Sequence, residues 1–175
     1  MKLTLEKGAL LKALSHVHSV VERRNAIPIL SNVLVEGDAG KLKLTATDLD
    51  LSMVEEVDAD VNQSGATTVP AHTLFDIVRK LPEGSQVALD LVDAGRMHLA
   101  AGRSRFTLAT LPREDFPHLA EGELPYRFSL SAGDLKRLIE KTRFAVSTEE
   151  TRHYLNGIYL HSIDVDGTLF LLSLI

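Results

Sequence analysis

The chain contains an internal repeat with a period of about sixty residues, and this repeat limits the folds it can adopt. A short strand pattern leads into an amphipathic helical pattern three times, at residues 3–5, 67–69 and 128–130. Several further strand patterns follow each of the first two helical segments. One such unit would expose a helix and a sheet face to water, so two units are expected to pair around a core.

The periodicity of apolar residues distinguishes the helices from the strands. Apolar residues at helical spacing predict helices within 7–24, 71–81 and 131–143, with Ser131 as the N-cap of the third. Strict alternation predicts strands at 41–45, 87–91 and 105–108. Glycine-containing turns at 37–40, 82–84 and 93–95 separate them. The predicted fold class is therefore α+β.

The repeat also predicts a domain organisation. Two units fill residues 1–120 and are expected to form a complete domain. Residues 121–125 are polar, contain Gly and Pro, and are predicted to be a linker. A third unit begins at 126 and ends unfinished at 175, so we expect a fragment of a larger repeat protein. Residues 126–175 should expose strand edges and apolar surface.

Charge is distributed unevenly in this chain of 175 residues with a net charge of −5. The three helical segments hold ten basic and four acidic residues, whereas the remainder holds nine basic and twenty acidic ones. The helical wheel places the following opposite the apolar stripes: Lys12, His16, Arg23, His72, Arg79, Lys80, Arg137 and Lys141. The simplest explanation of these basic residues is that they lie on helix faces that are exposed to water and bind no partner. Repetition in three helices favours a polyanion partner, bound through its phosphates without reading of sequence.

Several kinds of chemistry lack support in the sequence. The chain has no cysteine, no phosphate-binding glycine loop and no apolar run of membrane-spanning length, so we expect a cytoplasmic protein without a membrane segment. His16 and His18 diverge by about 200° on a helix and are not expected to share a metal. The acidic cluster is expected on a solvated outer sheet face rather than around Mg²⁺; its members are Asp48, Asp50, Glu55, Glu56, Asp58 and Asp60. No metal, cofactor or catalytic residue is predicted.

A set of short motifs carries a family resemblance. The motifs are PILSN at 28–32, TATDL at 45–49, GATTVPA at 65–71, LPEG at 81–84, GRSRF at 102–106, TLP at 110–112, DFP at 115–117 and RHYLNG at 152–157. Together they resemble the bacterial sliding clamp family, the beta subunit of DNA polymerase III. The resemblance extends from residue 1 to about 169, and the apolar tail 170–175 departs from it.

The resemblance implies a DNA-clamp fold of repeated β-α-β-β-β units, with antiparallel sheets outside and helices inside. Family members are head-to-tail homodimers of three-domain chains that close a ring around duplex DNA. They act as processivity factors that tether the DNA polymerase III catalytic subunit, the clamp loader and other clamp-binding peptides, and they catalyse nothing. The present chain would supply the first domain and the start of the second, and as a fragment it is not expected to close the ring.

The resemblance also suggests residue roles. The expected DNA-facing residues are Lys12, Arg24, Arg79, Lys80, Lys136, Arg137, Lys141, Arg152, His153 and Tyr154, although the family commonly has Tyr in place of His153. The expected subunit-interface residues are Arg96, Arg103, Arg105 and Leu108, for which a solvated edge strand is the alternative. Leu155 matches part of the groove for partner peptides, although an ordinary core leucine is the favoured interpretation here.

Two alternatives to a clamp remain open from the residues alone. The first is a non-enzymatic protein-interaction module whose basic helix faces meet an acidic protein. The second is an enzyme of the nucleotide-transfer class, which would need a carboxylate pair among Asp48, Asp50, Glu55 and Glu56.

Overall fold

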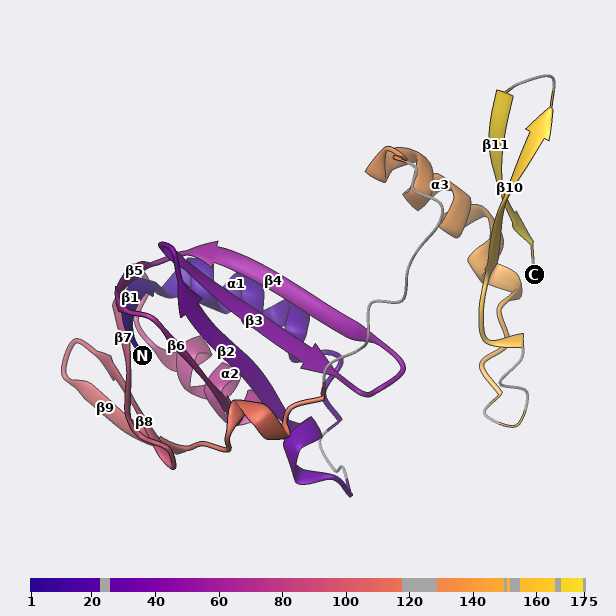
Figure 1. Ribbon diagram of the computed structural model, residues 1–175. Helices are drawn as coiled ribbons and strands as arrows, with labels where there is room; N and C mark the ends of the chain where they lie inside the picture. The colour runs from indigo at the N-terminus through magenta and orange to yellow at the C-terminus, as the bar shows by residue number, and fades with distance from the viewer. Residues whose placement is uncertain (23–25, 118–128, 150, 152–154, 166–167, 175) are drawn as a thin grey trace. The chain divides into compact units, whose positions relative to one another are not determined.

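The computed structural model describes residues 1–22, 26–117, 129–149, 151, 155–165 and 168–174, with side chains described as far as residue 160 (Figure 1). The chain divides into two compact units, Met1–Ala120 (unit 1) and Glu121–Ile175 (unit 2). Among the described residues, no helix combines the length and apolar character needed to cross a membrane.

Unit 1 consists of two β-α-β-β-β repeats, as the sequence predicts. The first comprises β1 (Lys2–Glu6), α1 (Lys7–Val17), the 3₁₀ turn η1 (Pro28–Ser31), β2 (Asn32–Asp38), β3 (Lys41–Thr47) and β4 (Ser52–Asp58). A short strand, β5 (Asp60–Gln63), follows it. The second comprises β6 (Gly65–Pro70), α2 (Ala71–Lys80), β7 (Gln86–Asp93), β8 (Arg96–Ala101) and β9 (Ser104–Ala109), followed by η2 (Arg113–Asp115). The predicted α+β class is confirmed.

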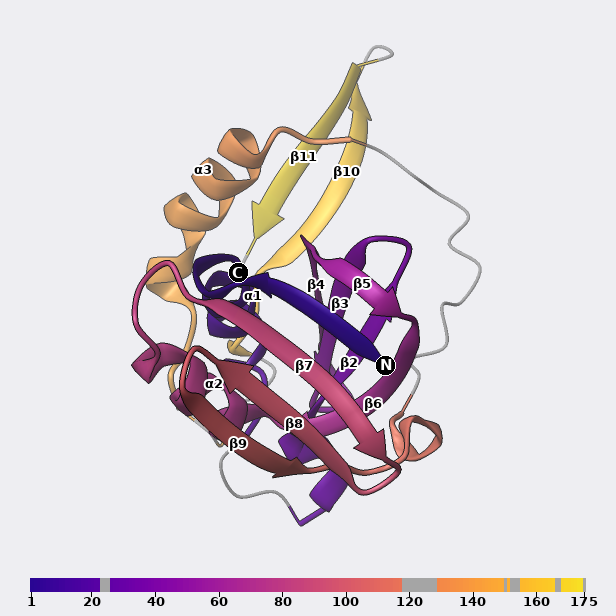
Figure 2. The same ribbon diagram turned by 90° about the vertical axis from the view of Figure 1, so that its left-hand side faces the viewer.

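The two repeats exchange their first strands. One antiparallel sheet has the order β5-β1-β7-β8-β9 and the other has the order β4-β3-β2-β6. Strand β1 of the first repeat therefore pairs with β7 of the second, and β6 of the second pairs with β2 of the first. Figure 2 shows β1 lying beside β7. Because each sheet needs a strand from the other repeat, neither repeat can complete its own sheet.

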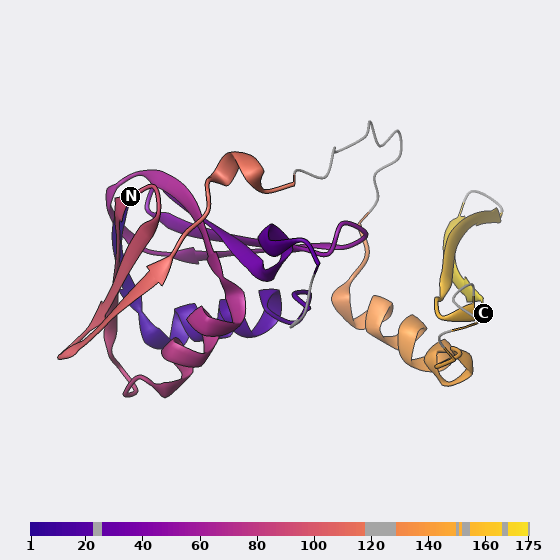
Figure 3. The ribbon, with the colours of Figure 1, turned by 90° about the horizontal axis from the view of Figure 1, so that it is seen from below.

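Helices α1 and α2 pack side by side against these sheets (Figure 3). Leu10 and Leu14 of α1, and Leu74 and Val78 of α2, are fully buried in one apolar core that also contains strand residues such as Leu3. Burial of one apolar stripe per helix leaves the opposite stripe of each helix facing solvent.

Helix α1 is shorter than its apolar periodicity predicts. It ends at Val17, and the next turn is held by bonds from the N–H of Ser19 to His16 O (3.2 Å) and from the N–H of Val20 to Val17 O (3.3 Å). Val20 and Val21 remain buried, so the apolar pattern continues through a tighter turn. Residues 18–22 of the predicted segment 7–24 are therefore not α-helical.

The hairpin between β2 and β3 uses the turn chemistry expected at 37–40. Asp38 and Lys41 are paired, and the two residues between them, Ala39 and Gly40, have φ angles of 47° and 78°. Positive φ at both central residues is the type I′ geometry that matches the twist of paired strands. The turn residues Ala39 and Gly40 thus set the register of β2 against β3.

Unit 2 contains α3 (Ala132–Thr142), η3 (Arg143–Ala145), β10 (Tyr159–Val165) and β11 (Thr168–Leu174). The predicted N-cap is confirmed, because Ser131 Oγ accepts the N–H of Asp134 at 3.1 Å. The strand expected at 128–130 is wrong for Ser129 and Leu130, which lie in no strand. Strands β10 and β11 form a two-stranded sheet, and a strand needs such a neighbour for its backbone hydrogen bonds. Phe128 and the predicted linker 121–125 lie outside the described residues.

Unit 2 exposes its apolar helical stripe. Leu135 and Ile139 of α3 are 37% and 42% exposed, whereas Leu10 and Leu14, at the corresponding positions of α1, are fully buried. The helix α3 has no buried residue. The expected apolar surface of 126–175 is present among the described residues of this segment.

Candidate nucleic-acid interface

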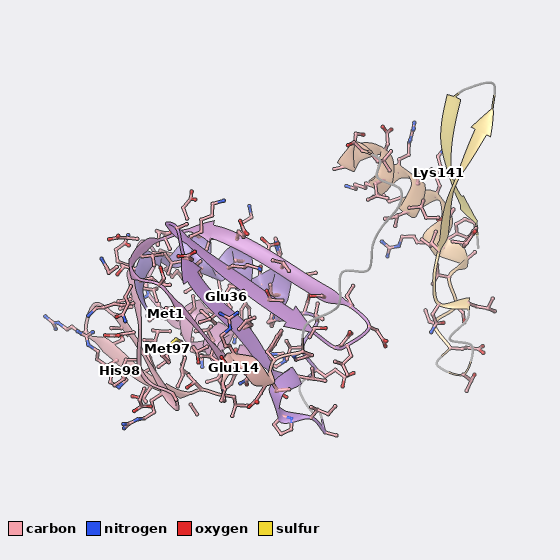
Figure 4. The ribbon with its side chains drawn as sticks, in the orientation of Figure 1. Met1, Glu36, Met97, His98, Glu114 and Lys141 are labelled. Carbon is pink, nitrogen blue, oxygen red and sulfur yellow. The ribbon has the colours of Figure 1, made fainter. Side chains whose placement is uncertain are left out.

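Three exposed cations of unit 1 lie on the solvent side of its helices. Lys12 of α1 is exposed because it lies on the helix face opposite the buried Leu10. Arg79 and Lys80 of α2 are exposed because they lie on the face opposite the buried Leu74. In unit 2, Lys136, Arg137 and Lys141 of α3 are likewise exposed; Lys141 is labelled in Figure 4.

A group of carboxylates, Glu36, Glu56 and Asp58, lies on the opposite side of the sheet β4-β3-β2-β6. In β4, Met53 and Val57 pack against the core while Glu56 and Asp58 are exposed, since side chains alternate along a strand. Figure 4 labels Glu36 on β2, which pairs with Lys43 and Arg113, both at 3.5 Å. On this sheet surface Glu36 and Glu56 form ion pairs with cations, whereas Lys12 and Lys80 on the helices of unit 1 have no ion pair among the described residues.

One member of the predicted outer acidic cluster faces the other way. Glu55 precedes Glu56 in the same strand, so the two side chains cannot share a face. Glu55 Oε1 lies 2.7 Å from His16 Nδ1 of α1. The prediction that Glu55 lies on the outer sheet face was therefore wrong.

Asp48, another member of the predicted acidic cluster, caps a turn. Its Oδ1 accepts the N–H groups of Asp50 and Leu51 at 3.0 and 2.7 Å.

His72 was expected on the basic helix face and is instead engaged in the seam between α1 and α2. Its Nε2 donates to Val21 O at 2.8 Å. Beside it, the ring of His18 stacks on Phe75 with centroids 3.9 Å apart and an angle of 13° between the ring planes. His16 and His18 thus point to different elements, so the helical divergence predicted for them is confirmed.

The positive charge of the helix faces is smaller than the sequence count suggests. Lys7 opens α1 but is buried, so it contributes nothing to the exposed face. Arg79 pairs with Asp76 at 3.0 Å, Arg137 with Asp134 at 3.1 Å and Lys136 with Glu140 at 3.8 Å. In the part of the chain that the structure describes, Lys12, Lys80 and Lys141 have no such ion pair. Arg23, Arg24, Arg152, His153 and Tyr154 lie outside that part.

The expected subunit-interface arginines lie on or next to β8 and β9, with β9 at the edge of its sheet. Arg96 is held by Asp93, whose Oδ2 accepts Nε and Nη2 at 3.0 and 2.7 Å. These charge-assisted hydrogen bonds to one oxygen lower the pKa of Asp93 and raise the pKa of Arg96. Arg105 donates to the carbonyl of Gly102 at 2.8 Å, and Arg103 is exposed in the same turn.

Leu108 does not present a contact surface in this chain. It is 4% exposed and belongs to the core of unit 1, whereas Phe106, two residues earlier on β9, is 37% exposed. Phe106 borders a hollow of about 320 Å³ that Ile77 and Leu81 line from the end of α2. Phe106 is exposed at this edge but is not among the interface residues that the family resemblance suggested, and strand alternation could not separate it from Leu108 because it puts both on the same face.

Leu155 is not a core leucine in this structure. It is exposed, and its carbonyl accepts the N–H of Ser147 at 2.9 Å. A separate hollow of about 550 Å³ lies in unit 2, lined by Leu135, Leu138 and Ile139 from α3 and by Val146, Thr148, Asn156, Ile158 and Leu160. Leu155 does not line it.

Paired β-α-β-β-β repeats with two antiparallel sheets and a cationic helix layer place unit 1 in the class of DNA-clamp domains. Residues 1–120 match the family described as DNA polymerase III beta subunit, N-terminal domain. The chain belongs to this family.

Individual relatives agree with this assignment. The beta sliding clamp of Caulobacter vibrioides is 53% identical over 95% of this chain, and that of Escherichia coli K12 is 45% identical over 90%. The solved Caulobacter crescentus pol III beta has a TM-score of 0.89 at 53% identity, covering 98% of this chain and 46% of that one. A Bartonella birtlesii sliding clamp bound to griselimycin has a TM-score of 0.91 at 48% identity and covers 98% of this chain and 45% of that one. The chain spans 45% and 43% of the two curated relatives.

Proposed function

We propose that this chain acts as part of a ring-shaped processivity clamp that encircles duplex DNA and tethers DNA polymerase and other partners, without catalysing a reaction. The observation that carries the proposal is the separation of charge in unit 1. Lys12, Arg79 and Lys80 lie on the exposed helix side, while Glu56 and Asp58 lie on the outer sheet side. Duplex DNA would be attracted to the helix side, because the acids of the outer sheet side are joined there by Lys41, Lys43 and Arg113 while Lys12 and Lys80 have no ion pair among the described residues.

The proposed contacts are to phosphates alone. Lys and Arg side chains on separate turns of a helix meet backbone phosphates without reading base edges. Such contacts are independent of sequence and weaken steeply with salt. A clamp that slides needs contacts of this kind, because topology holds it on the DNA while each individual contact stays weak.

The edge strand β9 supports a proposed subunit interface. Arg103, Arg105 and Phe106 are exposed there next to the hollow under α2. An apolar side chain in the hollow and carboxylates facing the arginines would complement this edge in a head-to-tail homodimer. Residues 126–175 would be the start of a second domain of the same kind, and Leu155 would contribute to a peptide groove.

Charge reversal on the helix face tests the proposal. The triple variant Lys12→Glu, Arg79→Glu and Lys80→Glu should abolish binding of a short fluorescein-labelled duplex, measured by anisotropy at low salt, where exposed charges are least screened. The matched control, Lys41→Glu, Lys43→Glu and Arg113→Glu on the outer sheet face, makes the same charge change and should retain binding. Equal loss in both variants would refute a specific helix surface. Binding of an unrelated acidic protein in place of DNA would support the interaction-module alternative.

A further inference from the structure

Two arginines on the exposed helix faces, Arg79 and Arg137, are each held by an aspartate three residues earlier in the same helix. Asp76 Oδ1 lies 3.0 Å from Arg79 Nη2, and Asp134 Oδ1 lies 3.1 Å from Arg137 Nη2. Residues three apart are neighbours on a helix surface, so these pairs are built into the helix.

Both pairs are open to solvent. The side chains of Arg79 and Asp76 are 56% and 43% exposed, and those of Arg137 and Asp134 are 67% and 51% exposed. Exposed pairs of this kind are weak and screened by salt, so a DNA phosphate can displace the carboxylate from the guanidinium. The displaced carboxylate nevertheless stays close to the phosphate and repels it.

We propose that Asp76 and Asp134 act as internal competitors of phosphate, which keep the contact between the arginines and duplex DNA weak. The inference rests on the proposed function. It assigns these two acids a role opposite to that of the cations beside them: they limit how long a phosphate stays bound. A surface of unopposed arginines would hold DNA more tightly than free sliding allows.

Asp76 caps no helix end, although it also lines the hollow beside Phe106. Arg79 Cζ lies 5.6 Å from the ring centroid of Phe75, so the guanidinium keeps a second contact on the helix face when the aspartate is neutralised. Asp134 has a second role at the start of α3, because its Oδ2 accepts the hydroxyl of Ser131 at 2.7 Å. Replacement by Asn keeps the size and an acceptor oxygen at both positions.

The test compares Asp76→Asn and Asp134→Asn with Glu56→Gln in the full chain. Glu56 belongs to an exposed ion pair with Lys41 (3.4 Å) on the outer sheet face, so Glu56→Gln makes the same charge change away from the helices. Anisotropy of a labelled duplex is measured over a salt series, and circular dichroism checks that each variant folds. We expect Asp76→Asn and Asp134→Asn each to tighten binding by roughly two- to fivefold. The slope of log affinity against log salt should steepen by up to about 0.9 per aspartate.

Each outcome decides the matter. Tighter binding in the Asn variants with an unchanged Glu56→Gln variant supports the proposal. Unchanged or weaker binding in Asp76→Asn, with the parent chain still binding in a salt-dependent manner, overturns the competitor role and leaves the proposed function standing. Equal tightening in Glu56→Gln would show an effect of net charge alone and would also overturn it. Absence of binding in every protein at the lowest salt would refute both the competitor role and the DNA-facing surface.

Discussion

The ammonium group of Lys7 pairs with the carboxylate of Glu83, although the Lys7 side chain is 2% exposed and the Glu83 side chain is 87% exposed. The backbone N–H of Lys7 also donates to Ser85 O at 2.9 Å. The first turn of α1 is thereby tied to the loop that follows α2, so the contact joins the two repeats. The whole Lys7 side chain is buried, so its ammonium group depends on the carboxylate of Glu83 for compensation.

Removal of the Glu83 charge should destabilise unit 1. Glu83→Gln leaves the buried lysine without its carboxylate, and we expect the free energy of unfolding to fall by about 1–2 kcal/mol in urea titrations. Lys7→Met should cost less, because Glu83 then returns to water. Glu114→Gln, at an exposed carboxylate on η2, is the control and should change stability by less than about 0.5 kcal/mol. A larger loss in Lys7→Met than in Glu83→Gln would contradict the pairing argument.

The ring of Phe75 should contribute to the seam between the helices. It stacks on His18 and packs against the core, so Phe75→Ala is expected to lower the free energy of unfolding by about 2 kcal/mol. The more exposed Phe106 serves as the comparison, and Phe106→Ala should cost clearly less. Equal costs measured by thermal unfolding would show that the stack adds nothing.

Gly65 should not tolerate a side chain. An added Cβ would lie 3.0–3.2 Å from the Cβ, Cα and N atoms of Met1, which is itself buried. Gly65→Ala should therefore reduce the free energy of unfolding by about 1–2 kcal/mol through overpacking. At Gly95 the added Cβ meets only Asp93 Oδ1, at 3.6 Å, so Gly95→Ala provides the matched control. A neutral Gly65→Ala variant would show that Met1 can move aside without cost.

The carboxylate of Glu6 should make stability depend on pH. Hydrogen bonds from the backbone N–H groups of Gly8 and Ala9 lower the pKa of Glu6 at the start of α1. A carboxylate whose folded pKa is lowered stabilises the fold above its unfolded pKa, and this contribution is lost as the pH falls through the folded value. Glu6→Gln should therefore reduce the melting temperature at pH 7, and the difference from the parent should vanish in acid below the folded pKa. A constant difference across the range would exclude this explanation.

Helix α3 should be less protected than α1 in solution. Its Leu135 and Ile139 are exposed where the corresponding Leu10 and Leu14 of α1 are buried. Hydrogen-exchange mass spectrometry should show faster exchange in peptides covering 132–142 than in those covering 7–17, because local opening costs least where little apolar area is buried. Limited proteolysis should likewise cut within 126–175 before it cuts within 1–110. Equal protection of the two helices would contradict the prediction.

The sequence by itself determined the repeat, the strand–helix order and the exposed cations Lys12, Arg79 and Lys80. These follow from local periodicity, since 3.6 residues per helical turn and two per strand decide which side chains share a face. The type I′ turn at Ala39 and Gly40 and the N-cap at Ser131 are local for the same reason.

Only the tertiary structure decided which elements meet. In the folded chain, β1 and β6 each pair with a strand of the other repeat, and Lys7 is buried. Glu55 contacts His16, and His72 lies in the seam between α1 and α2. Leu108 is buried although Phe106, on the same strand, is exposed. Each of these outcomes depends on a partner brought close from a distant part of the chain. Periodicity gives a side chain its face, but only packing decides whether that face meets water, a charge or the core.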